Sequence, residues 1–190
     1  MIRPATEADR DAIVALHLVS WQASYGIELP EPVLRDVLPG YLAEKWATRA
    51  FRNGQVTLVA EADGIIGFAC ALTGRTPASP TDEPPLRTDR LPLIDNLHVH
   101  PELRGGGWGG RLLTAMNAAL AEAGFDRSTL TVLARNQGAR RFYAARGGVD
   151  RGEEDDILVG HPVRVRRIVF ALDGGSGGLR PVQPTRHPRA

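Results

Sequence analysis

Five glycines fall within the six residues from 105 to 110, in the stretch RGGGWGGRLL. Glycine loses more conformational entropy on folding than any other residue, so this cluster indicates that a ligand or another segment approaches the backbone closely. A helical pattern starts directly after it, and the start of a helix offers free N–H groups and the positive end of the helix dipole. Together with the charge of Arg104, these groups predict a site for an anion, most often a phosphate.

Two nucleotide-binding interpretations of the same glycines are weaker. Gly105, Gly107 and Gly110 match the dinucleotide pattern G-x-G-x-x-G, but that fold needs an acidic residue at the end of the next strand. The next predicted strand, STLTVLA, is followed by Arg135 and Asn136 instead. The sequence also has no Walker lysine after the glycines, so a nucleoside triphosphate site is not expected. A glycine loop without any ligand is the structural alternative.

The elements that would hold this loop alternate between strands and helices. The residues from 74 to 92 contain five prolines and predict a long loop. The tail 173–190 is rich in Gly, Pro and Arg and is expected to be disordered. This order predicts an α/β (α+β) domain at 1–172 with one central sheet. We expect strands at 2–5, 56–61, 65–73, 93–99, 128–134 and 163–172. A first helix is expected to start at Thr6, and a second helical region, broken at 38–40, to end near Asn53. Two further helices are expected at 109–123 and 137–146.

Composition limits the classes of protein. A length of 190 residues with 43% hydrophobic residues suits one folded domain, and a formal charge of +1 gives no reason to expect nucleic acid as a partner. Cys70 is the only cysteine, so neither a disulfide framework nor a cysteine zinc site is expected, and no other metal-ligand pattern stands out. Without a signal sequence or a run of about 20 apolar residues, we expect a soluble, cytoplasmic protein that does not contact a membrane.

Two segments together resemble the GNAT superfamily of N-acetyltransferases. In LHVHPELRGGGWGGRLL, Arg104, Gly107 and Gly109 have the spacing [QR]-x-x-G-x-[GA] of that family's pyrophosphate loop. The later segment LTVLARNQGARRFYAARGG is similar to its second signature, N-x-x-A-x-x-F-Y-x-x-x-G. The opening IRPATEADRDAIVALH resembles the family's first strand and helix, so the resemblance covers about residues 1–172. The residues that match the second signature are Asn136, Ala139, Phe142, Tyr143 and Gly147.

The resemblance implies a GNAT-like fold and acetyl-CoA as the acetyl donor, with no metal. In that fold a mixed, mostly antiparallel sheet is flanked by helices and splays at the central strand, whose exposed edge pairs with the pantetheine arm. Leu97 and Val99 would offer this edge here, and the Leu97 N–H would polarise the thioester carbonyl. The cofactor-binding residues that we expect are Leu97, His98, Val99, Arg104, Gly105, Gly106, Gly107, Trp108, Gly109, Gly110, Asn136 and Phe142. For Asn136, a helix cap is the alternative role, and for Phe142 it is the core.

Catalysis of acetyl transfer also needs a proton donor and a proton acceptor. Tyr143 stands at the position of the family's general acid, and a phenol stays protonated at neutral pH. A packed aromatic residue is the alternative role for Tyr143. The general base is less clear, because Leu93 stands where many family members have glutamate. Asp95, acting through a water, is our candidate on the same strand face as Leu93, while His98 is expected on the opposite face.

The acceptor substrate follows from the resemblance only as a class. Trp21 and Tyr25 lie between the first two helices, where the family builds its acceptor cleft, although Trp21 could equally be core. The acidic run at 153–156 is expected to be a solvated loop. We expect a small-molecule amine or a peptide N-terminus as the acceptor, which attacks the thioester directly in a ternary complex, and we weigh a homodimer as the assembly. A catalytically silent acyl-CoA-binding module and, less favoured, a dinucleotide-binding oxidoreductase are the alternatives.

Overall fold

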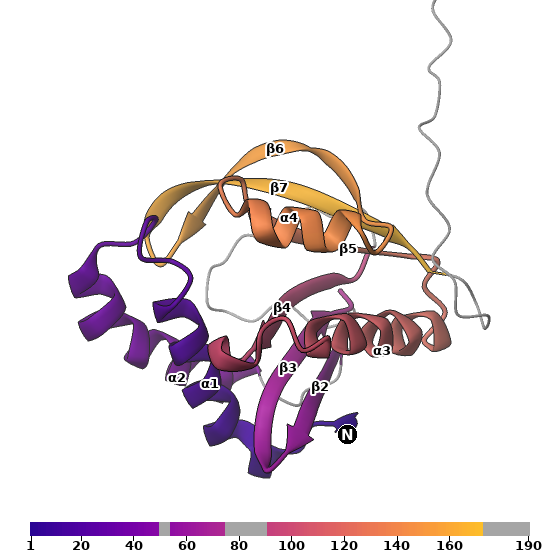
Figure 1. Cartoon of the computed structure of the whole chain (residues 1–190), viewed down its shortest axis with the longest axis horizontal. Helices are drawn as coiled ribbons and strands as arrows, with labels where there is room; N and C mark the ends of the chain where they lie inside the picture. Colours follow the sequence, from indigo (N-terminus) through magenta and orange to yellow (C-terminus); the bar gives the residue numbers. More distant parts are fainter. Residues whose placement is uncertain (50–53, 75–90, 173–190) are drawn as a thin grey trace, which may run out of the picture.

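The computed structural model describes residues 1–49, 54–74 and 91–172. The expected tail at 173–190 lies outside the described residues, and so does most of the expected loop at 74–92. Within the described ranges the chain forms one seven-stranded sheet in the order β1-β2-β3-β4-β5-β7-β6. Figure 1 shows the two halves of this sheet, with β2, β3 and β4 in its lower part and β5, β6 and β7 in its upper part. The strands are β1 (Ile2–Pro4), β2 (Gln55–Ala62), β3 (Gly64–Leu72), β4 (Leu93–Val99), β5 (Arg127–Leu133), β6 (Val149–Leu158) and β7 (His161–Ala171).

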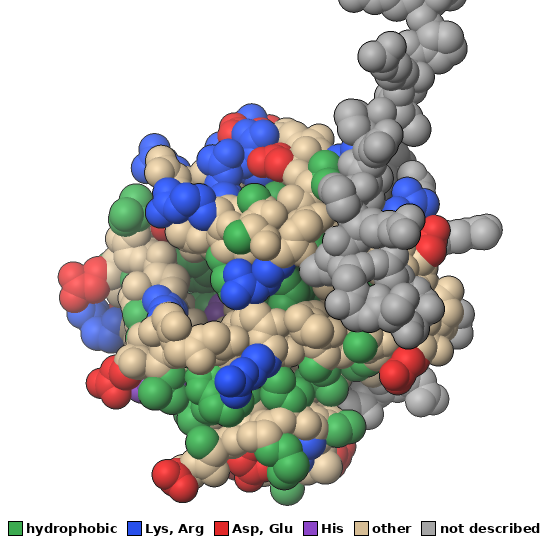
Figure 2. Space-filling view, turned by 45° about the vertical axis from the view of Figure 1, so that its right-hand side comes forward, with side chains coloured by type: hydrophobic (Ala, Val, Ile, Leu, Met, Phe, Trp, Pro, Cys, Tyr) green, Lys and Arg blue, Asp and Glu red, His purple; other side chains and the backbone are tan. Residues whose placement is uncertain are grey.

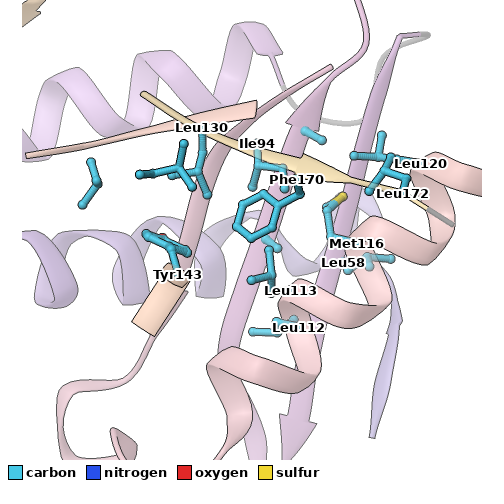
Figure 3. Packing of buried hydrophobic residues seen from close by; sticks show 14 of the residues in the cluster. Leu58, Ile94, Leu112, Leu113, Met116, Leu120, Leu130, Tyr143, Phe170 and Leu172 are labelled. Atoms are coloured by element: carbon cyan, nitrogen blue, oxygen red, sulfur yellow. The ribbon is translucent and has the colours of Figure 1, made fainter. Parts of the chain in front are cut away.

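One face of the sheet carries α3 (Trp108–Glu122) and α4 (Gln137–Ala144). The apolar residues of α3 recur at helical spacing, so they form one stripe that is buried against the strands. Figure 3 shows this stripe meeting Phe170 of β7, with Tyr143 of α4 beside it. The α3 face therefore holds the main core, which includes Leu58, Ala69, Ile94, Leu112, Leu113, Met116, Leu120, Leu130 and Ile168.

The opposite face carries α1 (Arg10–Gln22) and α2 (Leu38–Arg49). Here Val59, Phe68 and Cys70 of β2 and β3 pack against residues of both helices. Because successive strand residues point to opposite faces, the neighbouring Ala69 lies on the α3 side. The sheet is thus covered on both faces, as the alternating order of elements predicts. The short turns η1 (Glu7–Asp9), η2 (Val33–Val37) and η3 (Pro101–Leu103) complete the described elements.

The predicted interruption at residues 38–40 is wrong. The π-helical turn η2 runs directly into α2, and the Leu38 N–H donates to the Val33 carbonyl. Pro39 and Gly40 then occupy the first turn of α2, where a missing N–H removes no bond within the helix. The helical path therefore continues through residues 38–40, because the π turn ends just before the proline and α2 begins there.

The acidic run at 153–156 is part of strand β6 rather than a solvated loop. The arginines of β7 pair with it across the strands: Arg164 lies 2.8 Å from Glu153 and 2.7 Å from Asp155. Opposite charges on facing strand positions favour the pairing, and each partner is on the surface. Local charge alone could not show this, because the partners come from the next strand.

The central strands separate soon after they meet. β4 and β5 are parallel, and only Leu93 and Thr129 are in register, with the Thr129 N–H donating to the Pro92 carbonyl at 2.9 Å. β4 also carries a bulge, because Cys70 faces Asn96 whereas Ala71 faces Ile94. Asp95 is therefore the extra residue. The seven-stranded mixed sheet with its flanking helices is the fold that the sequence predicts.

Candidate active site

The glycine loop ends at the start of α3 in a left-handed backbone. Gly107 is the N-cap residue with φ +80°, and Gly105 has φ +87°, a region that side-chain-bearing residues rarely adopt. The first backbone bond of the helix runs from the Arg111 N–H to the Gly107 carbonyl at 3.1 Å. The N–H groups of residues 108–110 precede that bond and point out of the helix start. The loop thus presents N–H groups at the positive end of α3, as predicted for an anion site.

Two glycines of the loop also make room for α4. A Cβ atom at Gly109 would lie 3.4 Å from the Phe142 ring, and one at Gly110 would lie 2.7 Å from the Arg146 guanidinium. Arg146 stacks 3.9 Å from the centre of the Phe142 ring and donates to the Phe142 carbonyl at 3.1 Å. Arg146 therefore places a positive charge beside the loop. The sequence analysis missed it, although it lies only three residues after Tyr143.

The edge of β4 that faces β5 is open beyond the splay. His98 faces Phe68 of β3, and the His100 N–H donates to the Ile66 carbonyl at 2.9 Å. In an antiparallel pair only every second residue bonds to the partner strand, so Leu97 and Val99 turn their N–H and C=O groups away from β3. Since β5 has diverged after Thr129, these groups form the free edge that the sequence analysis predicts.

Tyr143 lies on α4 with its ring in the main core, 5.1 Å from the Phe142 ring and 6.2 Å from the Phe170 ring. Burial, and secondly the nearby Tyr25 phenol, raise the pKa of Tyr143 above its ordinary value. The hydroxyl therefore keeps its proton at neutral pH and can donate it. The packing of the ring fits the structural role weighed for Tyr143, and its role as the general acid stays a prediction.

Tyr25 and Trp21 have different surroundings. Trp21 is buried at 4% exposure in the core beneath α2, which supports the structural role that was weighed for it. Its ring lies 4.9 Å from Tyr25, which itself reaches across to Leu133 of β5 and Val163 of β7. Burial, then Glu28 and Asp95, raise the pKa of Tyr25 to about 12. Tyr25 thus joins the helix side of the site to the β5–β7 side.

Asp95 projects from the bulge toward α2. Its Oδ2 atom lies 3.2 Å from Lys45 Nζ and accepts a hydrogen bond from Asn96 Nδ2 at 2.6 Å. Both side chains of the ion pair are largely buried, at 12% and 19% exposure. Lys45 is the only lysine of the chain, and its approach to Asp95 could not be seen in the sequence.

The prediction that His98 and Asp95 point to opposite faces is wrong. Asp95 contacts Lys45 of α2, and His98 Nδ1 lies 2.9 Å from Ser20 Oγ of α1, so both meet the helices of the same face. The bulge at Asp95 shifts the alternation by one residue, which simple counting cannot anticipate. His98 is half-buried, and desolvation, together with Lys45 and Arg104, lowers its pKa to about 3. It is therefore a neutral imidazole.

Asn136 is the N-cap of α4. Its Oδ1 atom accepts a hydrogen bond from the Ala139 N–H at 2.9 Å. This confirms the capping role that the sequence analysis weighed, and a contact between its amide and the cofactor stays a prediction. The first two residues of the second signature, Asn136 and Ala139, are therefore joined by the hydrogen bond that caps α4.

The surface around the site is hollowed. Figure 2 shows a hollow between the α4 side and the α3 side, with hydrophobic and histidine atoms on its floor and basic side chains on its rim. A positive rim favours an anionic ligand. In the described ranges, no group of three or more His, Cys, Asp or Glu side chains could hold a metal ion. Among the helices in these ranges, none is long and apolar enough to cross a membrane.

Comparison of the fold with solved structures gives similar proteins of low sequence identity. A GCN5-related N-acetyltransferase from Rhodopseudomonas palustris has a TM-score of 0.68 and 22% identity, covering 90% of this chain and 95% of its own. Ribosomal-protein-alanine N-acetyltransferase from Brucella melitensis has a TM-score of 0.66 and 22% identity, covering 90% and 99%. YncA from Salmonella typhimurium, solved with its cofactor acetyl-CoA, has a TM-score of 0.61 and 20% identity, covering 100% and 98%.

Comparison with sequences gives a family. No curated protein matches the chain. The family model named acetyltransferase (GNAT) family matches residues 16–148, which include the second half of α1, the free edge of β4, the glycine loop and Tyr143. That match spans more than half of the chain. The chain therefore belongs to the acetyltransferase (GNAT) family.

Proposed function

We propose that this protein transfers the acetyl group of acetyl-CoA to a primary amine, by direct attack in a ternary complex. One observation carries the proposal: the free edge of β4 leads directly into a loop of exposed N–H groups at the start of α3. This arrangement suits a ligand with an extended amide-containing arm joined to a phosphate group. Acetyl-CoA has both parts, and a solved structure of similar fold holds it as its cofactor.

The residues of the loop and the edge would hold the donor. The N–H groups of Gly105 and of residues 107–110 would bind the pyrophosphate, whereas that of Gly106 donates to the Leu103 carbonyl, and Arg146 would add a positive charge beside them. Leu97 and Val99 would pair with the pantetheine arm, and the Leu97 N–H would stabilise negative charge on the acetyl oxygen. When bound, the cofactor supplies an acetyl thioester, which is activated toward amines.

Tyr143 would then act as the general acid. Its raised pKa keeps the phenol protonated until the thiolate, a stronger base than the ground-state thioester sulfur, takes the proton. The position of Tyr143 supports this role, since α4 packs against Gly109 of the glycine loop through the neighbouring Phe142.

Asp95 would be the proton acceptor, through a water between its carboxylate and the amine. Its position on the β4 bulge, two residues from Leu97, supports this assignment. The Lys45 ammonium, at 3.2 Å, favours the ionised carboxylate but also makes it a weaker base. An amine that arrives already deprotonated is the alternative.

The acceptor is proposed only as a class, a small-molecule amine or a peptide N-terminus. The Brucella melitensis relative is named for ribosomal-protein alanine, which makes peptides with N-terminal alanine a reasonable first group to test. A silent acyl-CoA-binding module is the second candidate, favoured by Leu93 in place of an acid and by the Asp95–Lys45 ion pair.

An acceptor screen separates the two candidates. Release of free thiol from acetyl-CoA is followed for the full chain with polyamines, amino sugars, free amino acids and N-terminal peptides. We expect acceptor-dependent release with at least one group. Tight acetyl-CoA binding without release for any acceptor would favour the silent module, and absence of binding would contradict both.

A further inference from the structure

The Arg104 side chain is directed to helix α1. Its Nη2 atom lies 2.9 Å from Ser24 Oγ, 3.2 Å from Ser20 Oγ and 3.4 Å from the Ser20 carbonyl oxygen. Ser20 lies in the last turn of α1, and Ser24 follows its end. A residue of the glycine loop thus contacts a segment about 80 positions earlier in the chain.

The Arg104 side chain donates a hydrogen bond to a backbone carbonyl at the end of α1 that has no partner within the helix. The backbone N–H groups there donate elsewhere: that of Ala23 to the Val19 carbonyl, and those of Ser24 and Tyr25 to the Trp21 carbonyl. The Ser20 carbonyl between them is one of the free acceptors at a helix C-terminus. A guanidinium at this place donates to it and also interacts favourably with the negative end of the helix dipole.

The contact extends through Ser20 to β4. Arginine can only donate hydrogen bonds, so Ser20 Oγ accepts from Arg104 and can donate its own hydrogen bond to His98 Nδ1, 2.9 Å away. Three elements are therefore tied at one point: the glycine loop by Arg104, the end of α1 by Ser20, and β4 by His98. Ser20 is buried at 2% exposure, which shields these hydrogen bonds from water.

The residues that follow Ser20 lie where the proposed acceptor would bind. Trp21 and Tyr25 lie on the turn that Arg104 contacts, and Tyr25 reaches Leu133 and Val163 on the other half of the sheet. We infer that Arg104 is a positioning residue: its side chain holds the end of α1, and with it Tyr25, while the backbone of the loop holds the phosphates. The inference rests on the proposed function for the role of the loop. It departs from assigning the Arg104 side chain to the pyrophosphate.

The test compares Arg104→Gln with Arg111→Gln in the full chain. Arg111 lies on the first turn of α3, and its guanidinium is 5.0 Å from the centre of the Trp108 ring. Arg111→Gln therefore removes one positive charge near the glycine loop and leaves the contact of Arg104 with α1 in place. Amide hydrogen exchange of residues 21–29, the acetyl-CoA Kd, and the acceptor KM and kcat are measured for both. Ser24→Ala removes one acceptor of the contact, and Arg104→Lys keeps the charge but loses the planar fork.

We expect Arg104→Gln to speed exchange at 21–29 and to raise the acceptor KM, each about tenfold, while the acetyl-CoA Kd stays within about threefold of that of Arg111→Gln. Arg104→Lys should keep the acetyl-CoA affinity and show intermediate exchange. Ser24→Ala should give part of the effect, and adding it to Arg104→Gln should give no more. The expected exchange does not need turnover, so failure of the acetyltransferase proposal would leave this part of the test intact.

Two results would overturn the inference. A loss of acetyl-CoA affinity about tenfold greater than that of Arg111→Gln, with unchanged exchange at 21–29, would make Arg104 a phosphate ligand. Faster exchange throughout the core strands, together with unchanged KM, would make the contact a general stabilising one.

Discussion

Burial, and after it the Tyr25 phenol, raise the pKa of Tyr143, although Tyr25 lies just after α1 and Tyr143 lies on α4. Tyr25 packs against Leu133 and Val163, on the half of the sheet that also supports α4. The proposed acceptor side and the proposed donor side would thus meet at these two phenols. Burial and this neighbour both keep the Tyr143 phenol protonated at neutral pH, so it is present as an acid and not as a base, while the raised pKa also makes it a weaker proton donor.

Tyr143→Phe separates catalysis from packing. The ring is kept and only the hydroxyl is lost, so we expect kcat to fall about 10²–10⁴-fold with little change in the acetyl-CoA Kd. Tyr25→Phe is the matched control, since it removes a second, half-buried phenol from the same region and should cost much less in kcat. A fall in kcat below about threefold, together with a loss of about 1 kcal/mol in unfolding free energy, would show that Tyr143 is structural.

Gly107→Ala and Gly124→Ala form a pair of substitutions at the two ends of α3. Both glycines have positive φ, +80° and +88°, and a Cβ atom would meet nothing within 4 Å at either. Each variant should therefore lose about 1 kcal/mol of stability from backbone strain. Only Gly107→Ala adds a methyl group to the glycine loop before α3, so only this variant should bind acetyl-CoA more weakly, by about tenfold or more. Equal affinities measured by calorimetry would contradict the assignment of the loop.

Asp95→Asn tests the proposed base. We expect kcat at neutral pH to fall about 10²-fold, and the loss to shrink as rising pH deprotonates the amine without help. Asp150→Asn is the control, because Asp150 is also paired with a cation, Arg166 at 2.6 Å, but lies on β6 away from the bulge. If both variants keep the wild-type pH–rate profile, the amine reaches the site already neutral.

Buried His17 and half-buried His98 should make the fold sensitive to mild acid. His98 has a pKa of about 3, and burial together with His98 and Lys45 holds the pKa of His17 well below its ordinary value, so both stay neutral when folded. Unfolded histidine gains a proton below about pH 6.5, so the unfolded chain binds more protons and stability falls as pH is lowered.

Each of the two histidines lowers the free energy of unfolding by up to about 1.4 kcal/mol for every pH unit lost between pH 6.5 and 5. Above pH 8 neither histidine makes the stability depend on pH to any useful extent. Urea unfolding of the wild type across this range measures the sum of the two contributions. His98→Gln, which can still accept from Ser20, should lose about half of it. A variant with the full wild-type slope would show that His98 is not the neutral group described.

The sequence predicts the elements of the site better than their contacts. The glycine loop, α3, α4 and the capping Asn136 are encoded locally, by glycine spacing, helical periodicity and a cap. Each was therefore visible within a short segment. The π-helical entry to α2 and the pairing of the acids in β6 were missed, because both depend on tertiary context.

The faces of β4 show why the rest could not be predicted. A bulge leaves no local signal, since it depends on how β3 pairs with β4, and one extra residue at Asp95 moves His98 to the face of Asp95. The contacts of Arg104 with Ser24 and of Asp95 with Lys45 join residues about 80 and 50 positions apart. Long-range polar contacts of this kind are decided by the fold and not by spacing.

The measurement that tests the central claim most directly is a titration of the ¹⁵N-labelled full chain with acetyl-CoA, in the presence of a chelator. The account predicts one-to-one binding, with the largest amide shifts at Leu97, Val99 and the glycines from 105 to 110, and smaller ones at Phe142 and Arg146. Absence of binding, a requirement for a divalent metal, or shifts confined to other surfaces would contradict it.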